Sequence, residues 1–224
     1  MRDGRGTLQH GLGVMTWHEL DQYISARTLL SAIVQLGRKE TNPVLMILDG
    51  TTPNMEHRYP PDGMSFAQDC WRAFYHSHET PDKAPNEHGH FHIFARKKKE
   101  SDEWTHVVGL AVDIAGQPVE WFAANKWVVR GIWHPATYLK RHLPPLDPHE
   151  DKNLAAQWLA ALLGTYRDEI NDLLVARDSF VETHSEKDDH TDVFEDRSIW
   201  KLAKCHIDLQ SKLESVLTHH DTAS

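Results

Sequence analysis

Five histidines lie in two short clusters, and their spacing suits metal or acid–base chemistry. One cluster is His76-Ser77-His78, and the other is Glu87-His88-Gly89-His90-Phe91-His92. Alternate side chains of a β-strand point to the same face, so His88, His90 and His92 would share one face. Imidazoles gathered on one face can hold a metal ion or carry out proton and phosphoryl chemistry. The two clusters therefore predict a functional site.

The two clusters can meet if both are strands joined by the loop of residues 79–87. Antiparallel pairing of His78 with His88 would place His76 opposite His90 on the same face. Directly opposed residues have Cβ atoms ~5 Å apart, which lets imidazoles converge on an ion at the ~2.0–2.1 Å distances of metal–nitrogen bonds. The predicted site depends on this pairing.

Residues 64–78 carry an ambiguous pattern on which that pairing depends. The positions that suit a helix are Phe66, Cys70, Trp71 and Phe74, whereas the aromatic-rich end of the segment suits a strand. On a helix, side chains two residues apart point ~200° apart, so His76 and His78 would not both face one ion. On a strand they would, and the five-histidine site requires the strand.

A metal-dependent enzyme is the function that the clusters favour. The candidate ligands, not all of them bound directly to the ion, are His76, His78, His88, His90 and His92. Imidazole suits iron, copper, zinc and nickel, and three ligands would leave an open coordination position for catalysis. We expect a non-haem iron or copper oxidoreductase that acts on a small molecule, with zinc as the other possible metal. The simpler interpretation is that these are exposed or packed histidines on a hairpin without a function. That interpretation would suffice for a single histidine, but it explains five in two alternating groups less well.

Nearby carboxylates are further candidates for the site. The parity of Glu87 with His88 puts Glu87 on the opposite face, unless the strand begins later. Nothing in the spacing selects Asp113 or Glu120. A non-catalytic metal-binding or delivery protein would use the same ligands, so that alternative stays open.

The second cluster also resembles the histidine-triad motif of nucleotide hydrolases and transferases. The matching stretch runs from His88 to Phe94. The resemblance implies that His90, the middle histidine, is a catalytic nucleophile toward phosphorus. Gly89 stands where that motif usually has an apolar residue, and the first histidine cluster has no role in it. A long segment also follows the motif, which normally closes its domain.

Composition limits the classes of partner. The chain has 224 residues with 33 acidic and 24 basic side chains, a formal net charge of −9, which argues against nucleic-acid binding. No run approaches the ~20 apolar residues of a membrane span, and the N-terminus has no signal-peptide pattern. Two distant cysteines make no disulfide framework. We expect a cytoplasmic protein with a small-molecule substrate, whose oligomeric state the sequence leaves open.

The pattern along the chain predicts one α+β domain. We expect an N-terminal helix, an antiparallel sheet that carries the histidines within about residues 40–145, and a helical C-terminal part over about residues 150–220. The expected helices are 15–36, 153–181 and 207–217, and the expected strands are 88–96, 104–114 and 118–129. Residues 44–48 form a short strand or a helix end, and the proline-rich segment 144–148 ends the sheet region.

Several segments together resemble an uncharacterised bacterial family with paired histidine motifs. They are Arg58-Tyr59-Pro60-Pro61, Phe74-Tyr75-His76-Ser77-His78, Glu87 to His92, Ala123 to Val128, and Val193 to Arg197. The resemblance implies that the two histidine clusters belong together and that Asn125, Lys126 and Trp127 lie near the pocket. Lys126 stands where such proteins usually have arginine. A hairpin end with a packed tryptophan explains these three residues equally well.

Overall fold

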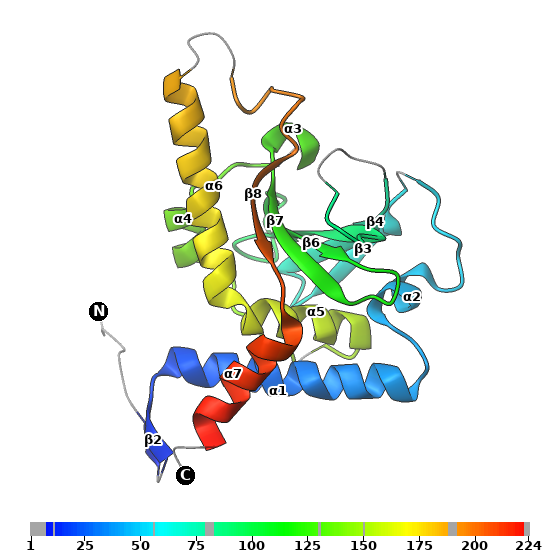
Figure 1. Cartoon of the computed structure of the whole chain (residues 1–224), viewed down its shortest axis with the longest axis vertical. Helices are drawn as coiled ribbons and strands as arrows, with labels where there is room; N and C mark the ends of the chain where they lie inside the picture. The colour runs from blue at the N-terminus through cyan, green and yellow to red at the C-terminus, as the bar shows by residue number, and fades with distance from the viewer. Residues whose placement is uncertain are drawn as a thin grey trace.

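A six-stranded antiparallel sheet lies at the centre of the molecule (Figure 1). The computed structural model describes residues 8–10, 12–55, 57–78, 83–129, 131–149, 151–187 and 192–221. In spatial order the strands are β3 (Tyr59–Phe66), β4 (Trp71–His76), β5 (Gly89–Ala95), β6 (Thr105–Val112), β7 (Pro118–Ala124) and β8 (Lys201–His206). A separate two-stranded sheet, β1 (Leu8–His10) and β2 (Leu12–Met15), precedes them.

Helices pack on one side and along one edge of this sheet. They are α1 (Trp17–Arg38), α2 (Pro43–Leu48), α3 (Lys126–Val129), α4 (Ala136–His142), α5 (Leu154–Thr165), α6 (Arg167–Lys187) and α7 (Leu209–Asp221). In Figure 1, α1, α5 and α7 lie below the sheet, while α6 runs alongside β8. The expected α+β class is confirmed.

Local signals explain where the main helices begin. Thr16 and Glu19 form a capping box, in which each side chain accepts a hydrogen bond from the other residue's backbone amide. Asn153 caps α5 through its side chain. Because α5 lies between α1 and the sheet, nearly all of its side chains are buried, and Trp158 packs against Phe91 of β5 at 6.2 Å between ring centroids.

The two faces of the sheet have different roles because side chains alternate along each strand. One face belongs to the apolar core and carries Tyr75, Phe91 and Trp121, each almost fully buried. Burial of an aromatic side chain of this kind stabilises the fold by ~1.5–3 kcal/mol. The opposite face carries His76, His90 and His92, and is called here the histidine face.

The structure resolves the ambiguous segments and corrects three expectations. The helix expected over residues 153–181 is two helices, α5 and α6, which meet at Tyr166. Residues 71–76 are a strand, as the five-histidine site requires, and residues 43–48 are the short helix α2. Residues 126–129 form helix α3 rather than an extension of β7. The sheet also does not end at residue 148, because β8 returns from the C-terminal part and pairs with β7.

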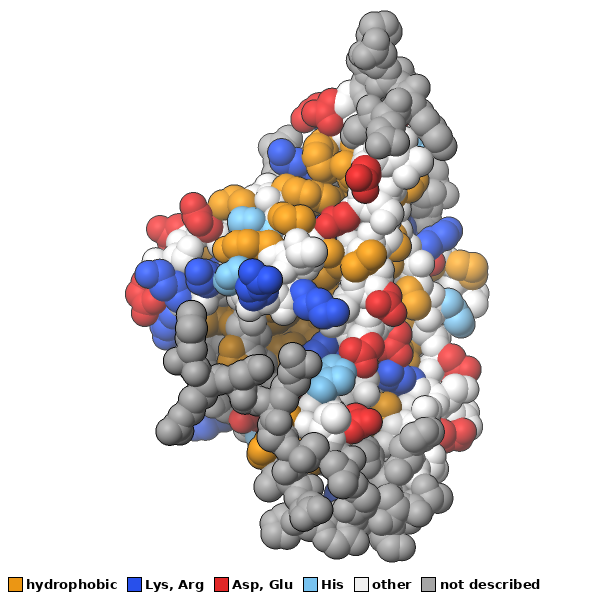
Figure 2. Space-filling view, turned by 90° about the vertical axis from the view of Figure 1, so that its left-hand side faces the viewer, with side chains coloured by type: hydrophobic (Ala, Val, Ile, Leu, Met, Phe, Trp, Pro, Cys, Tyr) orange, Lys and Arg blue, Asp and Glu red, His pale blue; other side chains and the backbone are white. Residues whose placement is uncertain are grey.

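The described helices include none that is long and apolar enough to cross a membrane. Figure 2 shows the side of the molecule along which α6 runs, where acidic, basic and apolar side chains are interspersed. The basic run at residues 96–99 lies outside the strands, and Lys99 pairs with Asp69 at 2.6 Å between exposed side chains. Lys97, Lys98 and Lys99 are exposed, so the run lies in a solvated turn.

Candidate metal centre

The pairing of β4 with β5 brings the two histidine clusters together. His76 lies directly opposite His90, as predicted, and Phe74 lies opposite His92. His78 follows the end of β4, and its ring centroid is 4.8 Å from that of His76 and 5.0 Å from that of His90. One ring nitrogen from each of His76, His78 and His90 lies within 4.8 Å of the other two. These three residues are called the three-histidine group.

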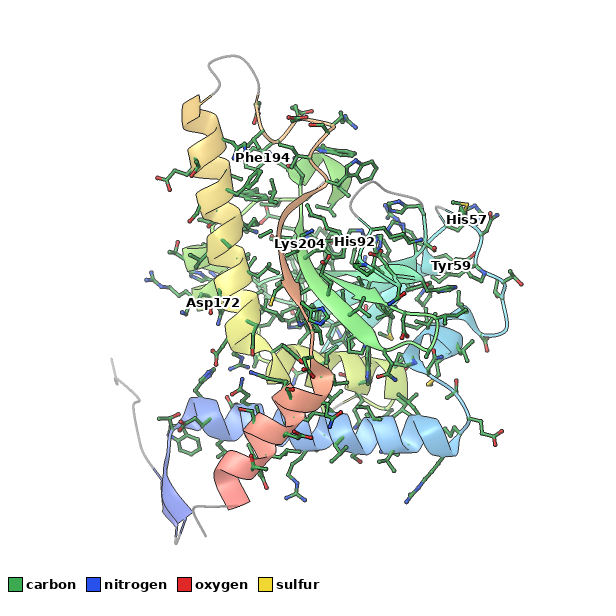
Figure 3. The ribbon with its side chains drawn as sticks, viewed as in Figure 1. His57, Tyr59, His92, Asp172, Phe194 and Lys204 are labelled. Carbon is green, nitrogen blue, oxygen red and sulfur yellow. The ribbon has the colours of Figure 1, made fainter. Side chains whose placement is uncertain are left out.

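The other two candidate ligands lie outside that group. His92 is on the histidine face, and its ring centroid is 5.0 Å from those of His76 and His90, while its Nδ1 is hydrogen-bonded to His106 Nε2 at 3.0 Å. His88 precedes the first residue of β5, and its Nδ1 lies 2.6 Å from the hydroxyl of Tyr75, a core-face residue. Figure 3 labels His92, which lies within the sheet between its two edge strands.

Glu87 faces the site because β5 begins only at Gly89, so strand alternation does not direct its side chain. Its Oε1 accepts a hydrogen bond from His90 Nδ1 at 2.6 Å, and its Oε2 accepts one from the Ala84 amide at 2.8 Å. Lys201 Nζ lies 3.7 Å from the same Oε2. A carboxylate on Nδ1 fixes the proton there and leaves His90 Nε2 to bind a metal.

Burial keeps the histidines of this face neutral. It lowers the pKa of His76 to about 3, helped by the neighbouring His90, His78 and Arg58. Burial also lowers the pKa of His90, although Glu87 opposes the shift, and holds the pKa of His92 well below its usual range. Burial would raise the pKa of Glu87, but the hydrogen bond with His90 and the charge of Lys201 keep it below its ordinary value. Neutral imidazoles are the form that binds metal.

His76 has a buried ring nitrogen that is available to bind a metal ion. Its Nε2 is buried and has no hydrogen-bond partner among the described residues. A buried polar atom left unpaired costs ~1–3 kcal/mol, so such atoms are uncommon in folded proteins. A metal ion at the three-histidine group would take the lone pair of this nitrogen.

Aromatic side chains surround the group. Phe122 packs edge-on against His90 at 5.3 Å between centroids, and Trp200 lies 5.8 Å from His78. Gly109 makes room for Phe122, because a Cβ at Gly109 would overlap the phenyl ring. The result is a largely apolar wall around three neutral nitrogen donors.

Two residues of this environment escaped the sequence analysis. His106 of β6 bonds to His92, and burial together with nearby Arg177 and His90 lowers its pKa to about 3. The pairing register of β5 with β6 shifts between Ile93 and Phe94. Simple alternation of side chains therefore did not place His106 beside His92. Lys201 pairs with Glu120 at 2.7 Å, and it was missed because β8 was not predicted.

The predicted pocket residues Asn125, Lys126 and Trp127 lie at the end of β7 and hold the segment that leads into β8. Asn125 is fully buried, and its Nδ2 donates to the carbonyls of Val193 and Ile199 at 2.8 and 3.0 Å. Trp127 Nε1 also donates to Ile199, and its ring packs on Trp200 at 4.5 Å. Lys126 lies 5.3 Å from the Phe194 ring. Trp127 is therefore connected to the three-histidine group by Trp200, which packs on Trp127 and lies near His78.

We expect Glu87→Gln to weaken metal binding ten- to a hundredfold while the fold is kept, because the glutamine loses the charge that orients His90. Glutamine also has one acceptor oxygen in place of two, so it loses the hydrogen bond from either His90 Nδ1 or the Ala84 amide. Titration calorimetry of the metal-free protein measures the affinity. Glu120→Gln is the matched control, since Glu120 pairs with Lys201 but not with His90. Equal affinities of the two variants would contradict the role of Glu87.

A family model described as a domain of unknown function, DUF6969, matches residues 24–207, a range that includes both histidine clusters. The resemblance to an uncharacterised family is thus confirmed for most of the chain. No curated protein and no solved structure matches it.

Proposed function

We propose that this chain, which belongs to the DUF6969 family, is a metal-dependent enzyme with one metal ion on His76, His78 and His90. The ion leaves an open coordination position toward a small-molecule substrate. We further propose that the metal is iron or copper and that the reaction is an oxidation or reduction. His92 and His88 are then neighbours of the centre rather than its ligands.

The unpaired, buried Nε2 of His76 within a group of three nitrogens is the observation that carries this proposal. Ligand nitrogens of a tetrahedral ion at ~2.0–2.1 Å lie ~3.3 Å apart. The three-histidine group spans at most 4.8 Å, so movements of about 1 Å would close it on an ion. Side-chain rotations of that size are small for residues at the end of a strand.

The donor set favours a redox metal. Three neutral imidazoles bring no negative charge to the ion, which favours the lower oxidation states of iron and copper. Such ions supply one-electron chemistry and O2 activation at an open position. The protein's part is to hold His90 through Glu87 and to keep water away with the rings of Phe122 and Trp200.

Hydrolysis by zinc is less well supported, because a hydrolytic site needs a group that accepts the proton of water. Glu87 is bound to His90 and the Ala84 amide, and Glu120 is bound to Lys201. The lowered pKa of His92 makes it a weak base. Histidine-triad chemistry is less well supported too, since His90 is 4% exposed, which leaves little room for phosphorus to reach it.

Elemental analysis of the full chain, purified without chelator or nickel affinity, tests the proposal. We expect close to one iron or copper per chain, and uptake of O2 by the metal-loaded protein in the presence of ascorbate. Metal-free protein is the control for O2 uptake. Stoichiometric zinc would overturn the redox assignment, and failure to bind any of these metals on titration would overturn the centre itself. A metal that exchanges within minutes without O2 uptake would indicate a delivery protein.

A further inference from the structure

A cavity of about 390 Å³ lies beside the proposed metal centre. Residues of β3, β4 and β5 line it, together with residues that flank the sheet. Those that bear on its chemistry are Arg58, Asp62, Arg72, Phe74, Phe94 and Trp104. Its size is that of a small-molecule site.

Two arginines give the lining of the cavity a net positive charge. The Arg58 guanidinium lies 4.6 Å from the Phe74 ring centroid, and the Arg72 guanidinium lies 4.4 Å from that of Trp104. Neither arginine forms an ion pair with a described residue, and Arg72 Nε is buried without a hydrogen-bond partner there. Asp62, an exposed residue, is the acidic group of the lining, so two positive charges face one negative charge. A buried guanidinium N–H without an acceptor calls for an anion.

The cavity also has aromatic side chains in its walls. Phe74 and Phe94 are stacked at 5.7 Å with an interplanar angle of 25°, and Trp104 adds a third aromatic ring. Gly63 accommodates the aliphatic part of Arg72, because a Cβ there would lie 2.8 Å from Arg72 Cγ. A planar ring fits such walls, and a carboxylate fits the forked donors of arginine.

Phe74 separates this cavity from the metal centre by the thickness of one ring. Its centroid lies 5.6 Å from that of His76 and 5.4 Å from that of His92. A ligand anchored at the arginines would therefore lie next to the proposed metal ligands.

We propose that this cavity binds the substrate of the metal centre, a small aromatic carboxylic acid whose carboxylate pairs with Arg58 and Arg72 and whose ring lies among the aromatic side chains of the lining. The identification of the acid as a substrate rests on the proposed function. The binding of the acid stands on the cavity alone.

Binding of 4-fluorobenzoate to the full chain, followed by ¹⁹F NMR, tests the site in metal-free and metal-loaded protein. We expect one bound acid per chain in both forms. Arg72→Gln and Arg58→Gln should each weaken binding ten- to a hundredfold, as expected for loss of a hydrogen-bonded charge partner. Arg27→Gln is the matched control, because Arg27 also lies over an aromatic ring, that of Tyr23, but on α1. Arg58 is exposed, so its variant keeps the test valid if Arg72→Gln fails to fold.

Two further measurements decide between the outcomes. Uncharged 4-fluorobenzamide has nearly the same shape as the acid. If the amide binds as tightly as the acid, the proposal that the cavity is an anion site is wrong. In cobalt-loaded protein, the acid should shift the visible absorption of the metal in the parent but not in Arg58→Gln. An unshifted spectrum with the acid bound would overturn its role as substrate. Normal metal loading without acid binding refutes this inference alone, and acid binding by a chain that takes up no metal on titration refutes the proposed function alone.

Discussion

Replacement of His90 by alanine should weaken metal binding about a hundred- to a thousandfold, an effect as large as any expected of a single substitution at the centre. His90 contributes one of three proposed ligands, and a four-ligand structural zinc site gains ~10–16 kcal/mol, so one ligand accounts for ~2.5–4 kcal/mol. The variant also leaves Glu87, which is 8% exposed, without its imidazole partner. Calorimetric titration with the metal found in the parent measures the loss. Circular dichroism of the metal-free variant checks that the fold is kept.

His88→Ala is the matched control, because it removes a histidine two residues away along the same chain. His88 bonds to the Tyr75 hydroxyl instead of joining the three-histidine group. We expect its metal affinity to stay within a few fold of the parent's, whereas His76→Ala should behave like His90→Ala. A loss as large in His88→Ala as in His90→Ala would show that the ligands differ from the three proposed here.

Acid should destabilise the metal-free protein steeply between pH 7 and pH 5. His76 and His106 have pKa values of about 3 in the folded chain, against an ordinary value of 6.5. The unfolded chain therefore takes up protons first, so stability is full above pH 6.5 and falls as the pH drops toward 3. At pH 5 each of these two histidines should cost ~2 kcal/mol, or ~4 kcal/mol together. Urea unfolding at both pH values measures the difference.

His106→Gln separates this effect from the titration of carboxylates. Glutamine does not titrate, so the loss of stability from pH 7 to pH 5 should be smaller by ~2 kcal/mol than in the parent. His18→Gln serves as the control, because His18 is exposed and pairs with Asp168 on the surface. If His106→Gln loses as much stability from pH 7 to pH 5 as the parent, protonation of buried neutral histidines is not the cause of that loss.

Much of the fold follows from local patterns in the sequence. The helical spacing over residues 15–36 identified α1, and the apolar segments that became β6 and β7 identified two central strands. The pairing of His76 with His90 was also predictable, because side chains repeat every two residues and the loop between the clusters is short. The sequence by itself thus determined an α+β chain with histidines collected on one face of a sheet.

Only the tertiary structure decided which of those histidines converge. Periodicity assigns a face but not the residue at which a strand begins, and the start of β5 at Gly89 turns His88 toward Tyr75 and frees Glu87 to reach His90. Lys201 lies near Glu87 because β8 pairs with β7, although the two residues are more than a hundred positions apart in the sequence. The sequence of this short segment does not predict that pairing. Contacts between distant segments depend on how the whole core packs, which no local pattern encodes.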